Sequence, residues 1–375
     1  MTSRRGFLAR AVAACFAGAG VWEKSILRAA QARASAVDGE ALFELRRISS
    51  SVWLALARPA PLLNCNAVIF DLSEGLLVVD THSKPSAAAA LVSQLGRELP
   101  GRPVRYIVNT HFHYDHTQGT SIYRKPGVDL IASKVTRDLL AERGPAAIRN
   151  SIDGMKRMAE SARAGLARAN NDADRRFYRR GAQEAEAFVR ELERYTPELP
   201  NITFDTGMTL HDKKQEVHLM FRGRAHTASD IFVFSPSQRV IATGDAAVGF
   251  IPGMGDGYPF EWPATLRSLV ELPFRGVLPG HGDPQESKDR IEDMRAMLEE
   301  MNEAVMRGRQ QGRTLAELQR AVTPGTLKTL APDGYGAYIA AMTAKYRWMP
   351  PGADPWDHMA DAVRSCVAAI YQKAG

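Results

Sequence analysis

The run His111-Phe112-His113-Tyr114-Asp115-His116 constrains this chain more than any other stretch of its 375 residues. It directly follows Val104–Val108, a short apolar run typical of a buried β-strand, so we expect it on a loop at a strand end. Side chains alternate along an extended segment, so the first two histidines can point the same way while the aspartate and the last histidine turn toward a second position. Imidazole and carboxylate are the ligands expected for zinc, iron or manganese. The run therefore predicts a metal site.

Three further polar residues each follow another strand-like run: His226 after Val217–Phe221, Asp245 after Val240–Thr243, and His281 after Gly276–Leu278. Sites in α/β proteins commonly form where strands end. A chance cluster of histidines on one solvated loop would not recur in this way. We therefore assign these residues to the same site as the histidine run.

Strand-like runs and helical periodicity both occur along the chain, which indicates a mixed α/β fold. Hydrophobic residues make up 45% of the sequence, enough for a sizeable core. We expect a catalytic domain over residues 37–290, interrupted by a helical insertion at about 134–195, and a C-terminal helical region over 291–375. The expected strands are 66–72, 76–80, 104–108, 128–132, 217–221, 231–234, 240–243 and 276–278, and helices are expected at 85–95, 264–272, 316–322, 335–346 and 360–371.

The first 36 residues have the order of an export signal. Ser3-Arg4-Arg5-Gly6-Phe7-Leu8 resembles the twin-arginine signature, an apolar stretch follows, and Ala34-Ser35-Ala36 is typical of a cleavage site, with Ala30-Gln31-Ala32 as a second candidate. Val12-Ala13-Ala14-Cys15 also resembles a lipoprotein cleavage box, which is the alternative interpretation. We expect the chain to use the twin-arginine export machinery, to be periplasmic or secreted, and to keep no stable membrane span after the signal is removed.

The basic charge of the chain belongs mostly to that segment. Residues 1–36 carry six basic side chains and one acidic side chain, so without them the net charge falls from +6 to about +1. A nearly neutral mature chain does not indicate a nucleic-acid partner. Cys65 and Cys366 stand in no metal-binding spacing and are expected to be buried thiols, with a disulfide between them left open.

The order of these motifs resembles the metallo-β-lactamase superfamily. The His-x-His-x-Asp-His run is followed by His226, then by Asp245 in a Gly-Asp pair, then by His281 in a Gly-His pair, over roughly residues 45 to 290. Asp80, in Val78-Val79-Asp80-Thr81, matches the first motif of that superfamily. The resemblance implies an α/β fold of the αββα sandwich type with metals at one edge. The long stretch from His116 to His226, and Ala225 where the family often has Gly, depart from the pattern without removing a ligand.

The resemblance also implies a ligand set. One metal would be held by His111, His113 and His226, and a second by Asp115, His116 and His281. Asp245 would bridge the two, and Asp80 would support the ligands from outside. We expect two divalent ions, zinc first, with iron or manganese as alternatives. Two metals sharing a water lower its pKa and give a bridging hydroxide, which Asp115 could orient as a catalytic residue.

Asp245 indicates the subgroup, because lactonase-like and glyoxalase-II-like members carry Asp at that position. We expect the substrate to be a small molecule that is hydrolysed at a carbonyl ester, lactone or thioester bond. The alternatives are β-lactamase-type amide hydrolysis and a mononuclear iron sulfur dioxygenase.

Substrate contacts have weaker signals. The loop from Gly255 to Trp262 could wall the pocket, and Tyr258 could donate to a developing oxyanion or, with Trp262, anchor the next helix. His82 lies two residues after Asp80 and could line the site. The sequence leaves open the oligomeric state and the role of the helical insertion.

Overall fold

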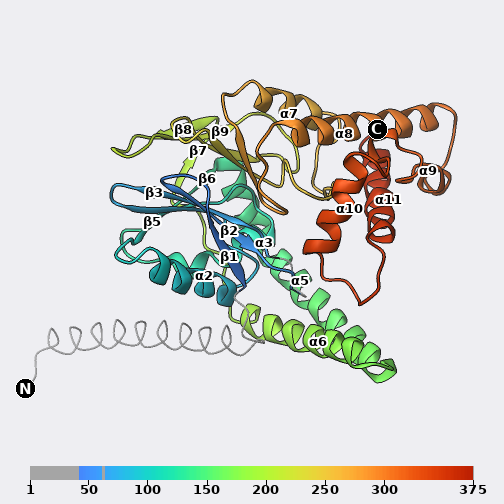
Figure 1. Ribbon diagram of the computed structural model, residues 1–375, viewed down its shortest axis with the longest axis horizontal. Helices are drawn as coiled ribbons and strands as arrows, with labels where there is room; N and C mark the ends of the chain where they lie inside the picture. Colours follow the sequence, from blue (N-terminus) through green and yellow to red (C-terminus); the bar gives the residue numbers. More distant parts are fainter. Residues whose placement is uncertain (1–41, 61–63, 375) are drawn as a thin grey trace, which may run out of the picture.

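Two β-sheets packed face to face form the centre of the computed structural model, which describes residues 42–60 and 64–374 (Figure 1). Helices cover the outer faces of both sheets, so the mixed α/β class and the αββα arrangement expected from the sequence are confirmed. The expected export segment, residues 1–36, lies outside the described residues. Within the described residues, no helix is long and apolar enough to cross a membrane.

The first sheet has seven strands, which lie side by side in chain order. Neighbours from β1 to β4 are antiparallel, and neighbours from β4 to β7 are parallel. The strands are β1 (Phe43–Arg47), β2 (Val52–Ala57), β3 (Ala67–Leu72), β4 (Gly75–Val79), β5 (Val104–Val108), β6 (Asp129–Ser133) and β7 (Ile202–Phe204).

The second sheet has five strands in the order β12-β11-β10-β9-β8. Its neighbours are antiparallel except for β11 and β12, which are parallel. The strands are β8 (Gly207–Leu210), β9 (Val217–Phe221), β10 (Ile231–Ser235), β11 (Val240–Gly244) and β12 (Gly276–Pro279).

Alternation along the strands builds three apolar layers. Phe70 points into the core between the sheets, while its neighbour Ile69 points out toward α2 (Pro85–Glu98). In the second sheet Val233 faces the same central core, and Phe232 faces the helices α7 and α8. Strands buried on both faces read as continuous apolar runs, which explains why most of them are visible in the sequence.

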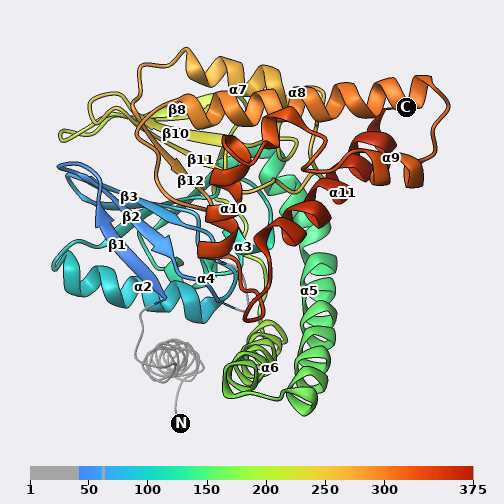
Figure 2. The same ribbon diagram turned by 45° about the vertical axis from the view of Figure 1, so that its right-hand side comes forward.

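Helices occupy the two outer faces and the spaces beyond them. The helical elements are α2, α3 (Tyr114–Thr117), α4 (Thr120–Tyr123), α5 (Lys134–Arg168), α6 (Asp172–Leu192), α7 (Trp262–Val270), α8 (Asp289–Gln310), α9 (Leu315–Ala321), the 3₁₀ turn η1 (Lys328–Leu330), α10 (Tyr335–Tyr346) and α11 (Pro355–Lys373). The pair α5 and α6 fills the range where an insertion was expected, and it forms a hairpin that projects away from the sheets (Figures 1 and 2).

The C-terminal helices pack onto the sandwich itself. Met342 and Tyr346 of α10 belong to the core between the two sheets, and α11 packs against α8 and α9. This docking brings the end of α10 close to the strand ends where the histidines lie. Cys65 and Cys366 are both buried and free, so the disulfide left open by the sequence is not formed.

Four described strands, β1, β2, β7 and β8, were not expected from the sequence. β7 and β8 have three and four residues that are half-buried or exposed, so they lack an apolar run. β1 is an edge strand that ends in Arg46 and Arg47. β2 does carry an apolar run of the length of a buried strand, so this strand could have been expected from the sequence.

Candidate metal centre

Seven candidate ligands come from four separate loops at one edge of the sandwich. The histidine run follows β5, and its second half forms the short helix α3, which turns Asp115 and His116 away from His111 and His113. His226 lies between β9 and β10, Asp245 follows β11, and His281 follows β12. The seven side chains fall into two groups: His111, His113 and His226, and Asp115, His116, Asp245 and His281. In each group the potential ligand atoms lie within 4.8 Å of one another.

In the first group, two histidine nitrogens face each other. His113 Nδ1 and His226 Nε2 are 2.9 Å apart. His226 Nδ1 lies 2.9 Å from the carbonyl oxygen of Gly253, and His113 Nε2 lies 3.1 Å from Asp256 Oδ2. These two nitrogens are therefore suited to carry the N–H of their rings. Both facing nitrogens then carry lone pairs, and a cation between them would remove their repulsion. This pattern fits a metal site.

In the second group, carboxylate oxygens approach histidine nitrogens. His281 Nε2 lies 3.0 Å from Asp115 Oδ2 and 3.4 Å from Asp245 Oδ2. His116 Nε2 lies 3.3 Å from Asp245 Oδ1. Asp245 Oδ2 is also 3.7 Å from His226 Nε2, in the first group. Asp245 thus stands between the two groups, where a bridging carboxylate would have to be.

Three buried atoms in this cluster make no hydrogen bond within the described residues: His111 Nε2, and the facing pair His116 Nε2 and Asp245 Oδ1, which lie 3.3 Å apart without the geometry of a hydrogen bond. Buried polar atoms are almost always hydrogen-bonded, because leaving one unpaired costs about 1–3 kcal/mol. Three such atoms converging on one place are explained if cations complete them. The donor set, imidazole with carboxylate, suits zinc, iron or manganese.

Asp80 supports the cluster from behind, as the resemblance implied. Its Oδ2 lies 2.8 Å from His116 Nδ1, which leaves His116 Nε2 free to face the cluster. Thr110 donates its backbone N–H and its hydroxyl to the same carboxylate, each at 2.8 Å. Asp80 has a φ of +67°, a left-handed conformation that costs energy in a non-glycine residue and is held here by these bonds.

Asp256 is a contact that the sequence did not reveal. Its carboxylate meets His113 Nε2 at 3.1 Å and Arg143 of α5 at 3.2 Å, so it connects the metal centre to the helical hairpin. The hydrogen bond from His113 lowers the pKa of Asp256 below its usual value. Asp256 and His113 are 143 residues apart, and no spacing rule joins them.

The electrostatics differ between the two ligand groups. Burial lowers the pKa of His226 to about 4 and that of His111 well below its usual value, with nearby histidines adding to the effect. Burial alone would raise the pKa of Asp115, but His116 and His281 outweigh it and lower the pKa to about 2. At neutral pH His226 and His111 are therefore neutral imidazoles and Asp115 is a carboxylate. Asp245 and the other nearby carboxylates outweigh burial and raise the pKa of His116 and His281, whose protons a bound cation would displace.

Cys65, Asp80 and His116 also lie close enough together to suggest a cation site. Burial raises the pKa of the Cys65 thiol to about 12, so the thiol is protonated at neutral pH when no cation is bound. Asp80 and His116 Nδ1 are already bonded to each other. This group is therefore better explained as packing beneath the centre.

Two of the three suggested pocket residues are placed in the interior. Trp262 is fully buried and donates its indole N–H to the carbonyl of Ala246 at 2.8 Å, so it anchors α7. His82 is also fully buried and stacks on Phe43 with 4.2 Å between ring centroids. Both side chains are as buried as His111 and His116, and the Trp262 ring lies 5.6 Å from the His226 ring, so the expectation that they line the pocket stays a prediction.

Tyr258, the third, is half-buried. The Arg224 guanidinium lies 4.3 Å from the centre of its ring, and the Lys373 ammonium lies 5.6 Å from it. These cation contacts favour the anchoring role over donation to an oxyanion.

Comparison with known proteins supports the family. The linear primary-alkylsulfatase of Pseudomonas sp. (strain ATCC 19151) is 22% identical over 247 residues, which are 61% of this chain and 43% of that protein. The chain thus spans less than half of the length of this curated relative.

Two solved structures share the fold. A metallo-β-lactamase from Pontibacter korlensis matches with a TM-score of 0.51 and 19% identity, covering 68% of this chain and 99% of its own. A stereoselective inverting sec-alkylsulfatase from Pseudomonas sp. matches with a TM-score of 0.60 and 17% identity, covering 88% of this chain and 50% of its own. The model of the metallo-β-lactamase superfamily matches residues 60–281, more than half of the chain. This chain therefore belongs to the metallo-β-lactamase superfamily.

Proposed function

We propose that this chain is an ester hydrolase with two divalent metal ions, zinc first. His111, His113 and His226 would hold one ion, Asp115, His116 and His281 the other, and Asp245 both. The observation that carries the proposal is the pair of ligand groups, each within 4.8 Å, with Asp245 between them. Divalent ions bound in this way supply acidity to a shared water and polarise the bond to be cleaved.

Asp115 is the proposed catalytic residue among the chain's own groups. Its pKa of about 2 keeps it ionised at neutral pH, and the contact with His281 fixes one of its oxygens. An ionised carboxylate in this place can accept a hydrogen bond from the attacking water and orient it. Asp80, through His116, and Asp256, through His113, hold the imidazoles in the tautomers that leave a lone pair on the cluster.

The proposed substrates are carbonyl esters, lactones or thioesters, because Asp245 stands at the bridging position as in lactonase-like and glyoxalase-II-like members. Sulfate esters are the second candidate. The similarity to two alkylsulfatases, one by sequence and one by structure, favours them.

A substrate panel on the metal-loaded chain tests the proposal. We would assay a carbonyl ester, a lactone, a thioester, a primary alkyl sulfate, a β-lactam and a phosphodiester at matched concentrations, beside metal analysis of protein purified without added zinc. Carbonyl or sulfate ester cleavage, abolished in His111→Ala, is the expected result. Faster phosphodiester or β-lactam cleavage would contradict the ester assignment, and a single iron would favour the dioxygenase alternative.

We also propose that the chain is exported through the twin-arginine route, because Arg4-Arg5 precedes an apolar stretch and a small-residue cleavage pattern. Replacing both arginines by Lys should retain the chain in the cytoplasm. Unchanged accumulation outside the cytoplasm, measured by cell fractionation, would overturn this.

A further inference from the structure

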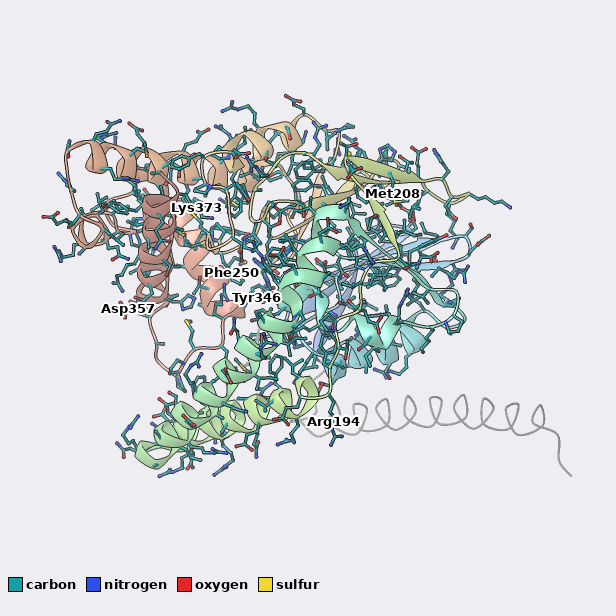
Figure 3. All side chains as sticks on the ribbon, turned by 180° about the vertical axis from the view of Figure 1, so that it is seen from behind. Arg194, Met208, Phe250, Tyr346, Asp357 and Lys373 are labelled. Carbon is teal, nitrogen blue, oxygen red and sulfur yellow. The ribbon has the colours of Figure 1, made fainter. Side chains whose placement is uncertain are left out.

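Arg347 lies beside the metal centre without belonging to it. It follows the last residue of α10, and its guanidinium stands 4.4 Å from the centre of the Phe250 ring. Phe250 in turn lies 6.1 Å from the His281 ring, centroid to centroid. Figure 3 labels Phe250 and Tyr346, the neighbour of Arg347, which lie close together where α10 meets the sheets. Arg347 and the candidate ligand His281 thus both lie next to the Phe250 ring.

The guanidinium lacks a counter-ion among the described residues. No carboxylate of the described chain forms an ion pair with it, and its Nε is buried without a hydrogen-bond partner. Burial lowers the pKa of Arg347, and the charges of Asp115 and Asp245 offset part of that effect. An arginine remains protonated in proteins, so this is a partly desolvated and unpaired cation.

The segment that carries Arg347 is held by the helical hairpin. Trp348 stacks on Phe177 of α6, with 4.8 Å between ring centroids and 12° between the ring planes. The guanidinium of Arg180, also on α6, lies 4.9 Å from the centre of the same indole ring. Two separate parts of the chain, the hairpin and the segment after α10, therefore meet next to Arg347 and restrict its position.

Metal loading would remove what compensation Arg347 has. This step rests on the proposed function. Two divalent ions bound at the cluster would engage the charges of Asp115 and Asp245, the two carboxylates that compensate Arg347. Arg347 would then lack a compensating carboxylate, and a bound anion would supply the missing charge.

We propose that Arg347 binds an oxyanion of the substrate, and that the substrates of this site are esters that carry a negative charge. The planar guanidinium can donate two parallel hydrogen bonds to a sulfate or a carboxylate group, which a neutral ester does not offer. The same chemistry could come from a sulfate monoester or from a carbonyl ester with a carboxylate on its acyl chain.

Substrate pairs that differ in charge test this inference. We would compare 4-nitrophenyl sulfate and the 4-nitrophenyl monoester of succinic acid with neutral 4-nitrophenyl acetate, using the metal-loaded full chain. Arg347→Gln should lower kcat/KM for whichever anionic ester the wild type cleaves by about 10- to 100-fold, as expected for a lost hydrogen bond to a charged group. The neutral ester should change by less than about threefold. Arg347→Lys should recover part of the loss, because the lysine ammonium restores the positive charge but not the two parallel N–H donors of the guanidinium.

Arg290→Gln is the matched control. Arg290 also lies 4.4 Å from the centre of an aromatic ring, that of Tyr338, but it is paired with Asp293 on α8. This variant should leave the preference for anionic over neutral esters unchanged. An equal loss in both charge classes in Arg347→Gln, or an unchanged preference, would overturn the inference.

A binding measurement separates this inference from the proposed ester hydrolysis. Calorimetric titration of metal-loaded protein with inorganic sulfate should give a Kd that rises about 10- to 100-fold in Arg347→Gln, with metal content and Tm unchanged. This result would support the anion site even if no ester in the panel is cleaved. The inference would be overturned if the wild type failed to bind sulfate. It would also be overturned if the folded Arg347→Gln and Arg347→Lys variants both bound sulfate with the Kd of the wild type.

Discussion

Asp245 has contacts at both of its carboxylate oxygens, and they reach histidines of both ligand groups. A residue in this position would hold two cations at once and reduce the repulsion between them. Removing Asp245 would therefore weaken the binding of both ions, whereas removing a ligand of a single ion would weaken the binding of that ion alone.

Asp245→Ala should therefore lower the metal content at both positions. Loss of a supporting residue outside the ligand sphere costs about 10- to 100-fold in metal affinity or activity, so loss of the bridging ligand should cost more than about 100-fold in turnover. Metal per chain and thermal unfolding would be measured together, with His281→Ala as the comparison that empties mainly the second position. Folded Asp245→Ala protein that keeps two metals and full activity would refute the bridging role.

Asp256 is the second residue whose loss has a specific expected result. Asp256→Asn weakens the acceptor for His113 Nε2, so metal affinity should fall by about 10- to 100-fold while the fold remains intact. Competition with a chelator would measure the affinity. Glu261→Gln is the control, because Glu261 lies on the same loop and pairs with Arg224. Equal effects of the two variants would count against a positioning role for Asp256.

At the scale of residues, the sequence indicated candidate ligands where polar side chains repeatedly follow apolar strands, and the structure brings these side chains together. The histidine run and the polar residues after β11 and β12 were recognisable because each follows an apolar strand. Asp256 and Arg347 were not recognisable, since a single charged residue on a loop or after a helix has no pattern. Their roles depend on which distant segments meet.

At the scale of elements, the hairpin of α5 and α6 shows what pattern can predict. Helical periodicity and the scarcity of β-branched residues predicted helices here, and α5 and α6 fill that range. The sequence did not predict how closely they pack. Small residues lie at the contact, among them Ala162 and Gly181, where a Cβ on Gly181 would come within 3.6 Å of the Ala162 methyl group.

Gly165→Ala should destabilise this hairpin. A Cβ at position 165 would lie 2.4 Å from Tyr178 Cε1, so the ring or the helix has to move, at a cost of about 1–3 kcal/mol. Gly154→Ala, in the same helix, meets no atom nearer than 3.9 Å and should stabilise the protein by up to about 1 kcal/mol through helix propensity. Hydrogen exchange in α5 and α6, with chemical unfolding, would measure both. Opposite signs are expected, and equal effects would contradict the packing argument.

At the scale of the whole molecule, the two sheets are joined by polar contacts as well as by their apolar core. The Asp212 carboxylate, in the loop after β8 of the second sheet, accepts hydrogen bonds from the backbone N–H and hydroxyl of Ser73, in the β3–β4 turn of the first sheet. It also accepts the backbone N–H of Lys214. The family motifs predicted the sandwich. They did not predict these hydrogen bonds between the sheets, because the bonds are formed by loops that carry no motif.

Asp212→Asn should lower the stability of the whole sandwich in a manner that depends on pH. Burial would raise the pKa of Asp212, but the hydrogen bonds from Ser73 and Lys214 outweigh it and lower the pKa below its usual value. A lowered folded pKa means that the contribution is complete above the unfolded value of about 3.9 and disappears as the pH falls through the folded pKa.

We therefore expect Asp212→Asn to cost about 1 kcal/mol in the free energy of unfolding at pH 7, with the difference from the wild type narrowing below about pH 4. Chemical unfolding at several pH values would measure it. Glu74→Gln, an exposed acid in the same turn as Ser73, should change little at any pH. A difference between Asp212→Asn and the wild type that stays constant down to pH 2 would show that the charge of Asp212 does not hold the two sheets together.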